Sequence, residues 1–229
     1  MHRAILTNDM EKLQVLYEDR HLIAVVKPFG VMSQGNEKTH SICDDINEYL
    51  KAKGENTEAF VIHRLDKTTG GVMFFAKTKV AASKMSTLVQ NGGFHKEYLA
   101  VLCSVPDENS AELSDLLYHD KMKNKTYVVK RERKGVKKAR LSYEALLEKE
   151  YNGTMCTLVK VKLYTGRTHQ IRVQFASRKF PLVGDRKYGT KVEDKTIALW
   201  SHKISFIHPF SGENVEVTSK ATDGAFSVF

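Results

Sequence analysis

Residues 60–79 read Phe-Val-Ile-His-Arg-Leu-Asp-Lys-Thr-Thr-Gly-Gly-Val-Met-Phe-Phe-Ala-Lys-Thr-Lys. Two short apolar runs, residues 60–62 and 72–76, are rich in strand-forming residues and bounded by breakers, so they predict two buried strands. The polar segment between them holds Asp66 among three basic residues and ends at Gly70 and Gly71. Glycine adopts backbone angles that other residues avoid, which suits a turn. The stretch therefore predicts a polar turn held between two core strands.

Two roles for Asp66 are open on this stretch alone. Loop aspartates most often stabilise a turn through hydrogen bonds to the nearby backbone. A single carboxylate on a loop braced by rigid strands is also a common placement for a catalytic group. The isolated stretch favours the first role, so the decision depends on motifs elsewhere in the chain.

Three separated motifs resemble those of the RluA-type pseudouridine synthases. The first is His63–Gly71, since the usual family motif is His-Arg-Leu-Asp followed two residues later by Thr-Ser-Gly. The second reads Gly-Arg-Thr-His-Gln-Ile-Arg-Val at 166–173, with Pro-Leu-Val-Gly-Asp at 181–185 and Tyr-Gly at 188–189. The third, residues 199–209, is similar to a closing Leu-Phe-His-Pro strand. The resemblance spans roughly residues 12–210, in the expected order.

The chain departs from the family motifs at a few positions. Thr69 stands in place of the usual Ser, and Phe180 stands where His normally precedes the Pro. Gln174 and Phe175 replace a more usual His-Leu. None of these changes removes a residue that the chemistry needs.

The resemblance implies a role for several side chains. Asp66 is expected to be the catalytic carboxylate, Tyr98 to stack on the target base, and Arg172 to favour the charged form of Asp66. A uridine in folded RNA must leave the stack to reach a pocket, and Arg64 is expected to fill the space it vacates. The expected substrate-binding residues are Arg64, His63, Leu65, Thr69, Arg167 and His169.

Ordinary structural roles remain open for some of these residues. Tyr98 lies in the predicted strand 94–102, where most tyrosines are simply core residues. Arg172 could be a surface arginine or an RNA phosphate contact, and Arg167 a structural residue or a phosphate contact. His63 is expected to fix the turn through hydrogen bonds rather than to transfer a proton.

The composition favours a polyanionic partner. The 229 residues carry a formal net charge of +9 and a sequence pI near 9.3. Such an excess suits RNA, DNA or an anionic membrane without distinguishing them. Residues 130–140 hold seven Lys or Arg and one acid, Glu132. This run is either a solvated face or a hairpin arm, between strands 126–129 and 141–147, that lies against RNA phosphates.

Cysteine spacing and the N-terminal residues restrict the location and the cofactors. Cys43, Cys103 and Cys156 are far apart and odd in number, which predicts reduced, buried thiols and no zinc or redox pair. The N-terminus lacks the apolar region of a secretory signal, and no run is long enough to span a membrane. We therefore expect a cytoplasmic protein, monomeric by default, with no membrane, metal or cofactor requirement.

The expected fold is α/β, a mixed and largely antiparallel sheet with helices packed on it. The family resemblance implies one catalytic domain over residues 1–229, with its core at about 12–219 and a central cleft. Since the first core strand begins about a dozen residues in, no separate N-terminal RNA-binding module is expected. Expected strands are 13–17, 22–26, 60–62, 72–76, 94–102, 126–129, 141–147, 154–164, 197–207 and 215–219. Expected helices are 41–53, 80–90 and 169–177, with Thr168 as the N-cap of the last.

The sequence therefore predicts an enzyme that isomerises specific uridines in RNA to pseudouridine. Without an added RNA-binding module, compact stem-loops of tRNA or large-subunit rRNA are the expected substrates. The rival is a catalytically silent RNA-binding protein of the same fold that acts in ribosome assembly or as an RNA chaperone. A hydrolase using Asp66 as general base ranks last, because no second carboxylate or metal cluster is apparent.

Overall fold

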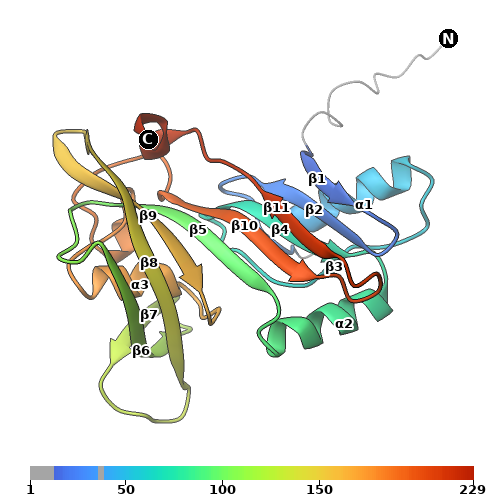
Figure 1. Ribbon diagram of the computed structural model, residues 1–229, viewed down its shortest axis with the longest axis horizontal. Coiled ribbons are helices and arrows are strands. Elements are labelled where there is room, and N and C mark those ends of the chain that lie inside the picture. Colours follow the sequence, from blue (N-terminus) through green and yellow to red (C-terminus); the bar gives the residue numbers. More distant parts are fainter. Residues whose placement is uncertain (1–12, 36–38) are drawn as a thin grey trace.

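One mixed sheet of eleven strands organises the computed structural model, which describes residues 13–35 and 39–229 (Figure 1). The strands are β1 (Val15–Glu18), β2 (Leu22–Lys27), β3 (Phe60–Val61), β4 (Gly70–Ala76), β5 (His95–Leu102), β6 (Ser110–Asp120), β7 (Lys125–Val129), β8 (Val136–Tyr151), β9 (Thr154–Leu163), β10 (Leu199–Ile207) and β11 (Asn214–Thr218). The helices are α1 (Ile42–Ala52), α2 (Lys79–Gln90) and α3 (Gln170–Ala176), with short 3-10 helices η2 (Arg186–Tyr188) and η3 (Gly224–Val228).

The strand order is β1-β2-β4-β10-β5-β9-β8-β6-β7, with β11 paired to β10 and β3 to β4. Within the described residues, every pairing is antiparallel except that of β4 with β10. The expected mixed, largely antiparallel sheet with flanking helices is thus confirmed. No helix in residues 13–35 and 39–229 has the length and apolar character needed to cross a bilayer.

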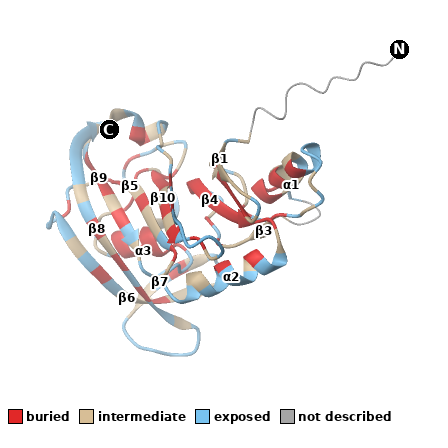
Figure 2. Cartoon of the chain, turned by 45° about the vertical axis from the view of Figure 1, so that its right-hand side comes forward, coloured by how far each residue is buried: buried red, intermediate tan, exposed pale blue. Residues whose placement is uncertain are grey.

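Strand β4 is buried on both faces along its whole length (Figure 2). Its residues Phe74 and Val72 pack in one cluster with Met85 of α2. Met73 and Phe75 point the other way, into a cluster that also holds side chains of α1 and α3. A strand covered on both sides reads as a continuous apolar run rather than an alternating one. Helix α2 therefore covers one face of the sheet, and α1 and α3 cover the other.

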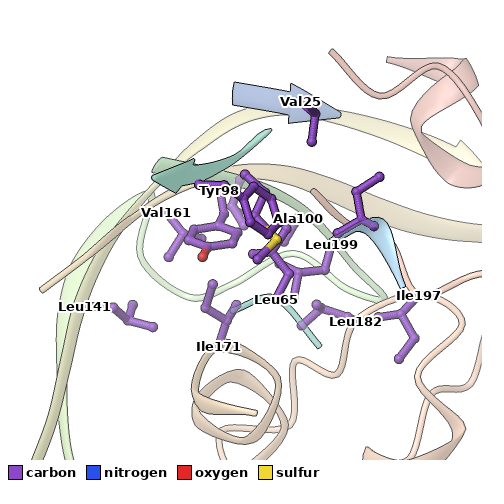
Figure 3. Close-up of a cluster of buried hydrophobic side chains, with 14 of the residues drawn as sticks. Val25, Leu65, Tyr98, Ala100, Leu141, Val161, Ile171, Leu182, Ile197 and Leu199 are labelled. Carbon is purple, nitrogen blue, oxygen red and sulfur yellow. The ribbon is translucent and has the colours of Figure 1, made fainter. Parts of the chain in front are cut away.

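The cluster on the α1 and α3 face supports the loop that carries Asp66. Leu65, the residue before Asp66, is buried in this cluster together with Tyr98 of β5 and Ile171 of α3 (Figure 3). Leu65 therefore anchors the loop to the same core that holds α3. Since Tyr98 and α3 also contribute to the expected site, one apolar cluster aligns three segments that are distant in sequence.

Gly70 and Gly71 do not close the turn, contrary to expectation; they are the first residues of β4. Gly71 has φ +113°, and a Cβ there would collide with the backbone of Ser201. A side chain on Gly70 would collide with the Trp200 ring. Glycine is therefore required because β10 lies directly against this part of β4, the only parallel contact among the described strands.

A hairpin formed by residues 126–129 and 141–147, one of the two interpretations of the basic run, is wrong. Strand β6 lies between β7 and β8 and pairs with both, so β7 is the edge of the sheet. The basic run is divided between two structures, because residues 130–135 connect β7 to β8 and β8 already begins at Val136. Ala139 is buried in a cluster with Val173 of α3. This apolar contact explains why β8 includes part of the charged segment 130–140.

The helix starts are set by local capping. Ser41 precedes α1, and its backbone N–H and hydroxyl both donate to the Asp44 carboxylate, as part of a capping box. Thr78 precedes α2, and its hydroxyl accepts from the Ala81 N–H at 3.1 Å. Such caps satisfy backbone donors that have no partner inside the helix.

Removing the α2 cap is expected to destabilise the protein slightly. Thr78→Ala should lower the free energy of unfolding by about 1 kcal/mol, the usual value of a threonine N-cap. For a chain of this size, that corresponds to a fall in Tm of about 2–4 °C. Thermal denaturation checks it, with Thr87→Ala as control, since Thr87 is exposed and its hydroxyl only bonds back to the Ser83 carbonyl. Equal falls in Tm for both variants would contradict the capping role.

Candidate active site

Asp66 lies on a loop whose side chains alternate between core and surface. Arg64 is exposed, Leu65 is buried, and the Asp66 side chain is 30% exposed. Alternate residues of an extended chain point the same way, so Arg64 and Asp66 both face outward. The Thr69 side chain is buried, and its N–H donates to the Asp66 carbonyl at 2.9 Å.

The turn at residues 27–33 holds the Asp66 loop in place. The Ser33 hydroxyl donates to the Leu65 carbonyl at 2.8 Å and accepts from the Leu65 N–H at 3.0 Å. The Gly30 N–H donates to the Lys67 carbonyl at 2.8 Å. Lys27 is fully buried, and its ammonium donates to two carbonyls of this turn. The pKa of Lys27 is lowered to about 8, because the effect of burial is larger than the opposite effect of the nearby Asp66 charge.

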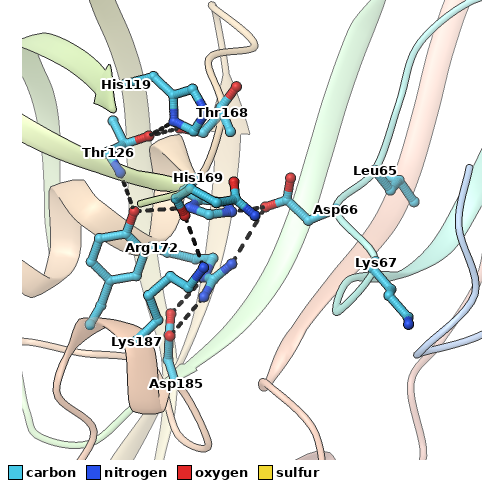
Figure 4. A network of polar contacts seen from close by, with 12 residues as sticks. Leu65, Asp66, Lys67, His119, Thr126, Thr168, His169, Arg172, Asp185 and Lys187 are labelled. Atoms are coloured by element: carbon cyan, nitrogen blue, oxygen red, sulfur yellow. Dashed lines mark hydrogen bonds and ion pairs between the residues drawn. The ribbon is translucent and has the colours of Figure 1, made fainter. Parts of the chain in front are cut away.

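Two basic side chains from one short helical segment face Asp66 (Figure 4). Arg172 Nη1 lies 3.7 Å and His169 Nε2 lies 3.8 Å from Asp66 Oδ2. Both distances are longer than a hydrogen bond, so the two groups act on Asp66 through electrostatics alone. Neither occupies a lone pair of the carboxylate. Arg172 in α3 and His169 at its N-cap therefore face the same carboxylate.

Arg172 is held on its far side by Asp185. Its Nε and Nη2 donate to the two Asp185 oxygens at 2.7 and 2.8 Å, and both side chains are almost completely buried. Burial alone would lower the pKa of Arg172, but Asp185 and then Asp66 raise it. The guanidinium is therefore a permanent cation with one edge fixed and another turned to Asp66.

His169 is held on its far side by Tyr188. His169 Nδ1 lies 2.9 Å from the Tyr188 hydroxyl, which also accepts from the Thr126 N–H at 2.8 Å. The pKa of His169 is lowered to about 4, because burial has a larger effect than the Asp66 charge, which acts in the opposite direction. The imidazole is therefore neutral at neutral pH.

The start of α3 differs from the expectation. His169, not Thr168, is the N-cap, and it has a left-handed backbone with φ 54°. The His169 side chain forms no cap hydrogen bond, and the Gln170 Oε1 accepts from the Arg167 N–H and the Thr165 hydroxyl, which ties the start of α3 to the preceding turn. Left-handed angles are strained for a residue with a side chain and occur often at functional sites.

His63 supports the site from below the loop. Its Nε2 accepts from the Phe74 N–H at 3.2 Å, so it ties the loop to β4 as expected. The imidazole is buried, and no described residue is hydrogen-bonded to its Nδ1. Burial, followed by the charge of Lys96, lowers the pKa of His63 to about 3.

This buried histidine is expected to make the protein acid-sensitive. The unfolded chain takes up the His63 proton near pH 6.5 but the folded protein only near pH 3, so stability falls as pH drops below 6.5. Between pH 6.5 and 5 we expect a loss of about 1–2 kcal/mol from this group. His63→Gln keeps an acceptor for the Phe74 N–H without titrating, so its urea midpoint should fall less over that interval. Identical pH dependence of the two proteins would contradict the assignment.

The remaining expected residues occupy different positions. Tyr98 is buried on β5 in the cluster under the loop, and burial, then the charge of Asp66, raises its pKa. Its hydroxyl therefore stays protonated at neutral pH. Arg167 is exposed, and its Nε donates to the Lys138 carbonyl at 3.0 Å, which ties α3 to the basic segment of β8.

Sequence reasoning missed four supporting side chains. Asp185 and Tyr188 lay inside the second motif but received no role, although an Asp and a Tyr three residues apart beside an Arg-containing motif were a usable signal. Lys27 and Ser33 gave no such signal, because nothing in a turn sequence shows which distant loop it contacts. In residues 13–35 and 39–229, no three His, Cys, Asp or Glu side chains are grouped as metal ligands would be. The three cysteines are free and buried, as expected.

Comparison with known proteins gives consistent matches. The sequence signature of the family described as RNA pseudouridylate synthase matches residues 21–177. The chain is 32% identical over 201 residues to the dual-specificity RNA pseudouridine synthase RluA of Vibrio parahaemolyticus, with 86% of this chain and 78% of that protein covered. It is 32% identical to the ribosomal large subunit pseudouridine synthase D of Nitrosomonas europaea, with 88% of this chain and 60% of that protein covered.

A third relative is the ribosomal large subunit pseudouridine synthase C of Buchnera aphidicola, 28% identical with 89% of this chain and 66% of that protein covered. The chain therefore spans about two thirds of the length of several curated relatives. The fold is similar to that of human RNA pseudouridylate synthase domain containing 1, with a TM-score of 0.78 and 22% identity over 95% of this chain and 87% of that one.

Proposed function

Because the chain belongs to the RNA pseudouridylate synthase family, we propose that it isomerises uridine to pseudouridine in RNA. The reaction breaks the bond between uracil N1 and ribose C1′ and forms one between C5 and C1′. The C5 proton is released and N1 gains a proton, so no atom or electron is lost overall. Such a reaction needs an ionised carboxylate beside the glycosidic bond and a pocket that excludes water.

One observation carries the proposal: Asp66 is a partly exposed carboxylate facing two fixed basic side chains. Arg172 and His169 lie 3.7 and 3.8 Å away, too far to occupy its lone pairs. Asp66 is therefore the proposed catalytic group, able to attack the sugar or the base or to remove a proton.

Arg64 is proposed to fill the space left by the flipped uridine. It is exposed and lies two residues before Asp66, and no ion pair within residues 13–35 and 39–229 holds its guanidinium. Unstacking a nucleotide costs on the order of a few kcal/mol, and a side chain inserted into the gap offsets part of it. Tyr98, below the loop, is proposed to stack on the base that enters.

The proposed substrate is a stem-loop of tRNA or large-subunit rRNA. Relatives described as ribosomal large subunit enzymes favour the rRNA class, and a relative described as dual-specificity suits more than one RNA. Residues 130–135 are exposed and basic, and Arg167 bonds to the β8 segment that follows them. We propose that this surface binds phosphates near the target, since each neutralised phosphate adds salt-sensitive affinity.

The test is release of tritium from RNA labelled at uridine C5. Wild-type protein should release tritium from either tRNA or rRNA. Nucleoside analysis should find as many moles of pseudouridine as of tritium released. Binding to both RNAs without release would favour the rival, a silent RNA-binding protein acting in ribosome assembly or as a chaperone. Release without pseudouridine would refute isomerisation. Mapping that found only an extended rRNA site would overturn the stem-loop proposal.

A further inference from the structure

Among the described residues, the hydroxyl of Tyr188 is the one group within hydrogen-bond distance of the His169 imidazole. It lies 2.9 Å from His169 Nδ1 and receives the Thr126 N–H at 2.8 Å. A phenolic hydroxyl has one proton to donate. Because its oxygen already accepts from the backbone of β7, its own proton is free to point at Nδ1.

We propose that Tyr188 is a positioning residue that holds His169 in the tautomer protonated at Nε2, so that this N–H points at Asp66. With Nδ1 accepting from Tyr188, the ring proton lies on Nε2, 3.8 Å from Asp66 Oδ2. Asp66 then faces two donors with different anchors, Arg172 held by Asp185 and His169 held by Tyr188. The inference rests on the proposed role of Asp66.

Several observations support a built arrangement. His169 and Thr126 are both buried, so water has little access to compete for these hydrogen bonds. Burial raises the pKa of Tyr188, which keeps its hydroxyl protonated and able to donate. His169 also keeps a left-handed backbone, a strained conformation that needs compensating contacts. The distance between such a donor and a carboxylate can be long in the free protein and shorten when the substrate binds.

The Tyr188 ring has a second contact, which allows the two roles to be separated. Its face lies 5.1 Å from the Arg172 guanidinium carbon. Tyr188→Phe keeps this ring and removes only the hydroxyl. Tyr188→Leu removes both, and should impair the reaction further than the Phe variant does.

The first test is a double-mutant cycle on tritium release. Tyr188→Phe should lower kcat about tenfold, the effect expected when a group facing a charged residue loses one hydrogen bond. KM should change less than twofold. In a His169→Gln background the same change should have no further effect, because residues acting through one contact are not additive. Additive losses would overturn the proposal.

Tyr143→Phe is the matched control. Tyr143 is a buried tyrosine, while Tyr188 is partly buried. The Tyr143 hydroxyl also forms one defined hydrogen bond, to the Glu108 carbonyl at 2.9 Å, and this bond does not involve the site residues. Its loss should lower Tm by a similar amount and leave kcat within twofold of wild type. If Tyr188→Phe and Tyr143→Phe had the same kcat, the hydroxyl of Tyr188 would have only a structural role.

The second test needs no catalysis. Nitrogen-15 spectra of the imidazoles report which ring nitrogen is protonated, and His169→Gln identifies the His169 signals. We expect the Nε2-protonated form in wild type and a mixture of forms in Tyr188→Phe. An unchanged tautomer would refute the inference even if the enzyme is active, whereas absence of pseudouridine with the expected tautomers would refute only the proposed function.

Discussion

Asp66→Asn is expected to abolish pseudouridine formation while leaving the fold and RNA binding intact. The amide has the same shape as the carboxylate but can act neither as nucleophile nor as base. Loss of such a group typically lowers kcat by about 10⁴-fold or more. Asp66 is partly exposed and forms no hydrogen bond through its side chain with a described residue, so its loss should change Tm by less than about 2 °C. Tritium release and thermal denaturation of the same preparation check both parts.

Two further variants show whether the effect belongs to this carboxylate. Asp107→Asn removes an equal charge from an exposed loop and should retain full activity. Asp66→Glu keeps the charge but displaces the carboxylate by the length of one methylene from its place beside the two donors, and it should remain strongly impaired. RNA affinity of Asp66→Asn should equal or exceed that of wild type, since one negative charge near phosphates is gone. Residual activity within tenfold of wild type would exclude Asp66 as the catalytic group.

Asp185→Ala is expected to reduce both stability and activity. Asp185 is fully buried and forms a two-point ion pair with Arg172. Removing one partner leaves a buried, unpaired guanidinium, which typically costs about 3–5 kcal/mol. The same change frees Arg172 to rotate away from Asp66, so kcat should fall about 100-fold or more. Urea denaturation and tritium release under native conditions measure the two effects separately.

A double variant separates the structural part from the catalytic part. Arg172→Met with Asp185→Leu replaces the pair by apolar side chains of similar size, and such replacements are often neutral or stabilising. Stability should therefore return toward the wild-type value while activity stays lost. If the double variant were active, the cation at Arg172 would be unnecessary. If Asp185→Ala alone were as stable as wild type, the buried pair would have no structural importance.

The sequence predicted the fold well where a local pattern carries the information. The run at 72–76 is apolar without alternation, and β4 is indeed buried on both faces. The helices at 41–53 and 80–90 have caps and spacing that agree with α1 and α2 within a residue or two. It failed where the partner is remote. Nothing in residues 126–147 shows that β6, rather than β8, pairs with β7.

The same division holds for the site. Arg172 was expected beside Asp66, and His169 in the substrate-binding set, because their motifs resemble those of one family. The structure places Arg172 Nη1 and His169 Nε2 both within 4 Å of Asp66 Oδ2. The anchors behind them could not be assigned in the same way. Tyr188 contacts His169, nineteen residues before it in the sequence. Thr126, whose N–H donates to the Tyr188 hydroxyl, lies on the edge strand β7, which carries no motif. Such pairs depend on tertiary packing, which spacing along one segment does not encode.

The pairing of β4 with β10 has a consequence for the nascent chain. Gly70 and Gly71 lead directly out of the Asp66 loop, and their parallel partners are Trp200 and Ser201. During translation the first motif leaves the ribosome long before that partner strand is made. Contacts between such distant residues form late, because closing a long loop is entropically unfavourable. The nascent protein should therefore carry an exposed basic surface among ribosomal RNA before it can catalyse, and activity should begin only when nearly the whole chain has been synthesised.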